Sequence, residues 1–163
     1  MNLASAIATI AGTYYVVSFF QTILHGLLGH WLHAGLIYRV HVFSHHRIYS
    51  GRNLRADSYS EKEKDVSYTY LFPAIAVAAA AYLLLPLDLF ALHLATLACA
   101  SLLHVYIHIH YHLKDTWLSR FEWFTRRRRL HFIHHRDNTK NFALLEFWLD
   151  RLLGTFADVA AKR

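Results

Sequence analysis

Long uncharged stretches alternate with polar, charged stretches along this chain. The first 38 residues contain no Lys, Arg, Asp or Glu, and Asp88 is the only charged side chain between residues 66 and 113. A helix needs about 20 apolar residues to cross the hydrocarbon core of a bilayer. The pattern therefore predicts membrane-spanning helices over residues 3–24, 71–85 and 89–103. A turn at Pro86 separates the second helix from the third.

The segments outside these predicted spans are strongly basic. All 17 Lys and Arg residues lie within residues 39–64 or 114–163. Because cytoplasmic segments of membrane proteins carry an excess of Lys and Arg, residues 25–66 and 113–163 are expected in the cytoplasm, with the N-terminus outside and the C-terminus inside. The chain is interpreted as a single membrane-embedded domain, residues 1–163. This domain is an all-α bundle with a His-rich helical cap, in a bacterial inner membrane or the endoplasmic reticulum.

The composition narrows the class of site. Of the 163 residues, 55% are hydrophobic and 17% are charged, so a disordered chain is excluded. The single cysteine, Cys99, excludes a disulfide framework and a Cys-ligated zinc or iron–sulfur site. The four consecutive arginines at 126–129 suit anionic lipid headgroups, because apolar aromatic residues flank them. No nucleic-acid partner is expected.

The unusual feature is a set of 14 histidines, most of which occur in clusters at the predicted cytoplasmic ends of the spans or just beyond them. The clusters are His25, His30 and His33; His41, His45 and His46; His104, His108, His110 and His112; and His131, His134 and His135. Because the spans converge there, the clusters are expected to meet. Imidazole binds Fe, Zn, Cu and Ni, and this number of histidines predicts two ions rather than one.

Residues three or four apart share a face of an α-helix, which sets how the histidines group. On that rule, His41 and His45 share a face and His46 is turned aside. His25 and His30, five residues apart, are widely spaced for one ion and better suited to two different ions.

The histidine pattern can be compared with several known classes of metal site. No histidine is followed by Glu, so the zinc protease motif is absent, and few carboxylates lie near the clusters, which disfavours a carboxylate-bridged di-iron bundle. A b-type haem electron carrier would leave most of the clusters without a role. A divalent-metal transporter would place its ligands at the middle of the membrane.

The ordered series H-x4-H, H-x3-H-H, H-x3-H and H-x2-H-H resembles the fatty acid hydroxylase/sterol desaturase superfamily of integral-membrane, non-haem di-iron enzymes. The likeness is strongest over residues 126–156. There an H-x2-H-H box is followed by Asn141-Phe142 and by the pattern Trp…Asp-Arg-Leu-x-Gly-Thr, which runs from Trp148 to Thr155.

Two features of the boxes differ from the family pattern or leave a choice. His41 precedes His45 by one residue more than the usual spacing of the second box. The third box has two frames, His104 with His108 or His108 with His112. The second frame is preferred because His112 lies closer to the last box.

The resemblance implies a ligand set for two iron ions. The ten implied ligands are His25, His30, His41, His45, His46, His108, His112, His131, His134 and His135. His33 and His104 are possible additional or alternative ligands, and no catalytic residue beyond the metal ligands is implied. Asn141 and Asp150 are expected to orient histidine rings from outside the ligand set. Zinc is expected to replace iron in some purified samples, because histidine sites accept both metals.

The resemblance also implies an activity, the O2-dependent hydroxylation of a membrane lipid with a fatty acyl, sterol-like or related apolar structure. A desaturase would use the same site, so the choice between the two reactions stays open, and the b-type haem carrier remains the alternative of another class. The bilayer would supply the substrate. An electron donor such as ferredoxin, or cytochrome b5 with its reductase, would supply the electrons.

Overall fold

The computed structural model describes residues 2–33, 35–60 and 71–158. Every regular element in this part of the chain is a helix, and the one β-type contact is an isolated bridge between Ala56 and Leu113. The prediction of an all-helical fold is therefore confirmed for the described residues. The end of the predicted cytoplasmic segment, residues 61–66, lies outside them.

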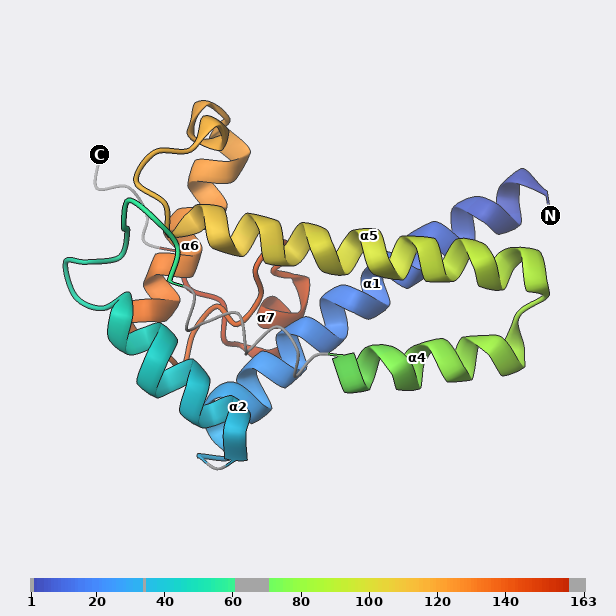
Figure 1. Ribbon diagram of the computed structural model, residues 1–163, viewed down its shortest axis with the longest axis horizontal. Coiled ribbons are helices and arrows are strands. Elements are labelled where there is room, and N and C mark those ends of the chain that lie inside the picture. Colours follow the sequence, from blue (N-terminus) through green and yellow to red (C-terminus); the bar gives the residue numbers. More distant parts are fainter. Residues whose placement is uncertain (1, 34, 61–70, 159–163) are drawn as a thin grey trace.

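Two long helices, α1 (Leu3–Gly26) and α5 (Leu87–Tyr111), pack along each other and form the axis of the molecule in Figure 1. A π-helical turn, η1 (Leu27–Trp31), extends α1. The stretches Leu3–Trp31 and Leu87–Tyr111 are each long and apolar enough to cross a membrane. The second predicted span, residues 71–85, corresponds to α4 (Leu71–Leu84), whose 14 residues measure about 21 Å against roughly 30 Å of hydrocarbon. Among the described residues, the structure thus supports two candidate spans, and a third span is not confirmed.

The long helices place apolar residues outside and small polar residues between them. Leu3 of α1 and Leu87 and Leu102 of α5 are largely exposed, whereas Ser18 and Thr22 of α1 are buried. Small side chains allow two helices to approach closely in lipid, where apolar burial gives no driving force. This distribution is the reverse of a soluble helical bundle and agrees with a lipid-facing exterior.

The remaining helices form a compact region at the end of the bundle opposite the N-terminus (Figure 1). We call this region, residues 27–33, 35–60 and 112–158, the head. Its elements are α2 (Gly35–Val40), the π-helical turn η2 (His41–His46), the 3₁₀-helix η4 (Trp117–Arg120), α6 (Glu122–Arg136) and α7 (Trp148–Leu153). α6 ends at Arg136, and a loop from Asp137 to Phe147 connects it to α7. The end of α5 at Tyr111, beyond the predicted residue 103, carries His108 up to the head.

An apolar core fixes α6 and the loop before α7 against the end of α5. Ile107 and Tyr111 of α5, Phe124 of α6, and Leu144 and Leu145 of the loop are all buried in one cluster. The Tyr111 hydroxyl donates to the carbonyl oxygen of Leu144 at 2.8 Å. This core holds the histidines of α5 and those of α6 at a fixed separation.

Candidate metal centre

Ten histidine side chains converge where the long helices meet the head, and they form two groups of five. Group 1 consists of His25, His30, His41, His46 and His134. Group 2 consists of His45, His108, His112, His131 and His135. Within each group, the candidate ligand atoms lie within 4.8 Å of one another. The two groups together contain the ten histidines that the family resemblance implied as ligands.

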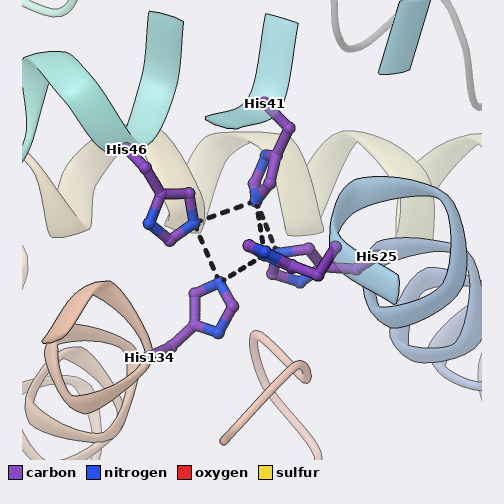
Figure 2. A group of neighbouring side chains, drawn as sticks. His25, His41, His46 and His134 are labelled. Atoms are coloured by element: carbon purple, nitrogen blue, oxygen red, sulfur yellow. Dashed lines mark hydrogen bonds between the residues drawn. The ribbon is translucent and has the colours of Figure 1, made fainter. Parts of the chain in front are cut away.

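In group 1 the imidazole Nε2 atoms point at a common centre (Figure 2). The Nε2 atom of His41 lies 2.8 Å from that of His25 and 3.1 Å from those of His30 and His46. The Nε2 atom of His134 lies 3.1 Å from those of His30 and His46. Ligand nitrogens held at about 2.1 Å from one ion, and at right angles to each other, stand about 3.0 Å apart. The spacing in group 1 therefore matches coordination of a single ion.

Group 2 has the same arrangement. The Nε2 atom of His45 lies 3.0 Å from that of His135 and 3.2 Å from that of His108. The Nε2 atom of His131 lies 3.0 Å from that of His112 and 3.1 Å from that of His135. The two groups are thus two separate sets of converging nitrogens with equivalent geometry.

Backbone carbonyl groups fix the tautomer of four of these rings. In each case the Nδ1–H donates to a carbonyl oxygen, which leaves the Nε2 lone pair directed at the centre of the group. The acceptors are Phe142 for His25, Leu54 for His112 (2.9 Å), Lys140 for His134 (2.8 Å) and Tyr49 for His135 (2.8 Å). Lone pairs that face one another at about 3 Å repel unless a proton or a cation lies between them. The donor set therefore fits a metal cation at each centre.

Two π-helical turns explain how histidines five residues apart belong to one group. The turn η1 follows His25 and contains His30, and η2 runs from His41 to His46. A π-helix forms hydrogen bonds from residue i to residue i+5, so residues five apart lie on the same face. Both pairs therefore point into group 1, while His45 points into group 2. The predictions that placed His41 with His45 and separated His25 from His30 were wrong, because they assumed α-helical geometry.

Two histidines that were candidate ligands lie outside both groups. His33 is exposed, with a backbone φ of 49°. His104 is buried one turn before His108, and its Nδ1–H donates to the Ala100 carbonyl oxygen at 2.8 Å. Group 2 contains His108 and His112, which corresponds to the frame of the third box preferred from the sequence.

Asp150 supports the centre through the backbone. Its carboxylate is fully buried and accepts from the N–H groups of Phe142 and Ala143 at 2.9 Å each, and from the Thr155 hydroxyl at 2.6 Å. The carbonyl of Phe142 in turn holds His25. Among the described contacts, Asp150 has no hydrogen bond to a histidine ring and reaches His25 through the Phe142 peptide group, so the expectation that it orients a ring stays a prediction.

Asn141 has a similar role in the same loop. Its side-chain N–H groups donate to the carbonyl oxygens of Leu130 at 3.0 Å and Ala157 at 2.7 Å, and its side-chain oxygen accepts from the Ala157 N–H at 2.8 Å. Its φ of 53° lies in the left-handed region, which Asn tolerates better than most residues. Asn141 thus also acts on the backbone, by fixing the loop that carries the Lys140 and Phe142 carbonyls.

Burial favours the neutral form of grouped histidines in the head. It lowers the pKa of seven of them, and the charge that neighbouring imidazoles would carry lowers it further in each case. These are His41, His45, His46, His112, His131, His134 and His135. A neutral imidazole is the form that binds metal, so the head presents ligands that are ready to coordinate at neutral pH.

The lowered pKa values predict acid sensitivity of the metal-free protein. In the unfolded chain these histidines take up protons near their ordinary pKa of 6.5, while in the folded protein they do not. Stability is therefore highest above pH 6.5 and falls as the pH drops below it. Metal-free protein in detergent should lose roughly 10 °C of melting temperature between neutral pH and about pH 5. A melting temperature that is constant over this range would contradict the burial of these rings.

Comparison with known proteins agrees with the geometry. The model of the fatty acid hydroxylase family matches residues 10–155, a stretch that contains all ten grouped histidines as well as Asn141 and Asp150. No curated protein and no solved structure gives a significant match to the chain. Because the family match covers most of the sequence, the chain belongs to the fatty acid hydroxylase family, within the fatty acid hydroxylase/sterol desaturase superfamily.

Proposed function

We propose that this protein is a membrane-embedded, di-iron hydroxylase that uses O2 to oxidise an apolar lipid. The observation that carries the proposal is the pair of five-histidine groups, in which Nε2 atoms converge at the spacing of metal ligands. Within the described residues, neither group contains a Cys, Asp or Glu. An all-imidazole set accepts both iron and zinc, and two groups provide for two ions.

The bound irons would supply the chemistry that inserts an oxygen atom from O2 into a C–H bond. The protein's own residues hold the two ions and limit the access of water to them. Tyr49 stacks on the ring of His112 with centroids 4.0 Å apart, and Phe142 lies against the rings of His25 and His134. Tyr49 and Phe142 are each 1% exposed. These aromatic side chains cover the rings of His25, His112 and His134 and shield them from water.

The long helices support a lipid as the substrate. His25 and His30 lie in the first candidate span and His108 in the second, so both groups are reached directly from the apolar bundle. A fatty acyl, sterol-like or related lipid would approach along these helices, and a desaturase would use the same site. We place the head in the cytoplasm and the N-terminus outside, in a bacterial inner membrane or the endoplasmic reticulum. Ferredoxin, or cytochrome b5 with its reductase, would be the electron donor.

The two alternative functions fit the geometry less well. A haem iron takes one or two axial ligands from the protein, whereas each group here gathers five imidazoles. A transporter would need ligands spread along the membrane path, whereas the grouped histidines lie where the spans meet the head.

Metal analysis of the purified protein tests the proposal. Detergent-purified protein from iron-supplemented cells should contain about two irons per chain, one for each group, and should show no Soret band. With a chemical reductant, O2 and a lipid extract, mass spectrometry should detect a lipid that has gained one oxygen atom, or lost two hydrogen atoms for desaturation. A Soret band, or a protein that binds neither iron nor zinc, would contradict a di-iron centre.

A further inference from the structure

A polar cleft on the surface of the head opens onto both histidine groups. It has a volume of about 520 Å³. Its lining consists of Val42, His46, His135, Arg136, Asp137 and Asn138. His46 belongs to group 1 and His135 to group 2, so one cleft reaches a candidate ligand of each ion.

The two rings in the cleft link the groups. The imidazoles of His46 and His135 are stacked, with centroids 4.3 Å apart and planes at 24°. This is the shortest ring separation between the two groups among the described contacts. Both rings are half-buried, whereas seven of the ten grouped histidines are buried. The stacked pair is therefore a point at which both candidate ions approach solvent through their own ligands.

Positive charge flanks this pair on both elements. His46 is followed directly by Arg47, and His135 by Arg136, and both arginines are exposed. The one acidic residue of the lining, Asp137, accepts hydrogen bonds from the N–H of Thr139 at 3.1 Å and from its hydroxyl at 2.6 Å. Arg136 thus lies in the lining of the cleft, the exposed Arg47 directly follows the lining residue His46, and the one carboxylate of the lining is hydrogen-bonded within its own loop.

The charged lining does not suit the apolar substrate, which approaches along the spans. It suits what the reaction must receive from the aqueous side. Insertion of one oxygen atom of O2 into a C–H bond, with reduction of the other atom to water, consumes two electrons and two protons. Two molecules of a one-electron carrier, each oxidised by one electron, supply the electrons, and water supplies the protons.

We propose that this cleft is the docking surface of an acidic one-electron carrier protein, and that electrons reach the two metal groups through the stacked His46 and His135. The inference rests on the proposed function and specifies where its electron donor binds. Complementary charge speeds the encounter of such partners and fixes their orientation. Interfaces between redox partners are typically small, and their complexes are short-lived. A cleft flanked by two arginines is large enough for such an interface.

Binding measurements test the docking surface without turnover. Zinc-loaded protein in phosphatidylcholine nanodiscs is titrated with two probes, an acidic [2Fe–2S] ferredoxin and the soluble haem domain of cytochrome b5. The cleft variant is R47E/R136E. The control is R126E/R129E, which makes the same change in net charge at two exposed arginines that pair with Asp158 elsewhere on the head. The zinc content of each variant is measured to show that the metal centre is intact.

We expect at least one carrier to bind the wild type, with an affinity that falls as salt rises. The cleft variant should weaken that binding at least tenfold, and the control less than about twofold. The inference is overturned if neither carrier binds, if the cleft variant binds as the wild type does, or if both variants weaken binding equally. These outcomes are distinct from failure of the proposed function, which would appear as absence of iron or of oxidised lipid in the wild type.

Discussion

Replacing His134 with alanine should abolish lipid oxidation and remove about one of the two irons. The side chain is fully buried, its Nδ1–H is fixed on the Lys140 carbonyl, and its Nε2 lies 3.1 Å from two other group 1 nitrogens. Alanine leaves group 1 with four imidazoles and a cavity in place of the fifth. Because loss of a supporting partner alone costs 10–100-fold in affinity or activity at metal sites, loss of a ligand should cost at least about 100-fold. Iron per chain and product formation are the measurements.

Two further variants make this prediction specific. His131→Ala should remove the other iron, because His131 belongs to group 2. His33→Ala should keep both irons and full activity, because His33 is exposed and lies outside both groups. A His134→Ala protein that keeps two irons and still oxidises lipid would contradict the assignment of group 1.

The family resemblance named the ten histidines that the structure gathers into two groups, but it did not give their division between the groups. Histidine is rare enough that clusters such as His131, His134 and His135 stand out in a chain of this length. Their division depends on the helix type at each cluster. The last box follows ordinary α-helical spacing, so His131 and His135, four apart, share group 2. In the second box the π-helical turn η2 brings His41 and His46 together instead, and a backbone conformation of that kind has no residue signature.

The hydrogen bonds that orient the imidazole rings could not be predicted from the sequence either. The acceptors for His25, His112 and His135 are backbone carbonyls more than 50 positions away along the chain. Every residue type offers the same carbonyl, so no pattern of residues marks the ones that serve. Asn141 and Asp150 were singled out by the family resemblance, yet their partners among the described contacts are peptide groups and the Thr155 hydroxyl rather than rings.

The length of the long helix α5 also could not be predicted from the sequence, for a different reason. Absence of charge identifies apolar segments reliably, but it does not give the length of a helix. The predicted span ends at residue 103, just before His104, whereas the helix α5 continues to Tyr111. Histidines on the inner face of that last turn are enclosed by protein rather than lipid, so they do not end the helix.

Asp150 is the residue outside the ligand set whose loss should have the largest effect. Asp150→Ala would leave the buried N–H groups of Phe142 and Ala143 without their acceptor, and would release the Thr155 hydroxyl. Breaking a buried, charged hydrogen-bond network of this kind costs about 3–5 kcal/mol. The melting temperature should therefore fall by roughly 10 °C. Because the Phe142 carbonyl holds His25, iron should be lost from group 1 before group 2.

Two comparisons separate this role from a general effect of charge. Asp158→Ala removes a surface carboxylate that pairs with Arg126 and Arg129, and should cost less than about 1 kcal/mol without loss of iron. Asp150→Asn keeps one acceptor oxygen but turns an NH2 group toward a peptide N–H. Its melting temperature and iron content should therefore lie between those of Asp150→Ala and of the wild type. Thermal unfolding and iron content of the three variants are the measurements. If Asp150→Ala has the melting temperature of the wild type and keeps two irons, the loop does not position His25. The orientation of the His25 ring must then come from the packing of Phe142 alone.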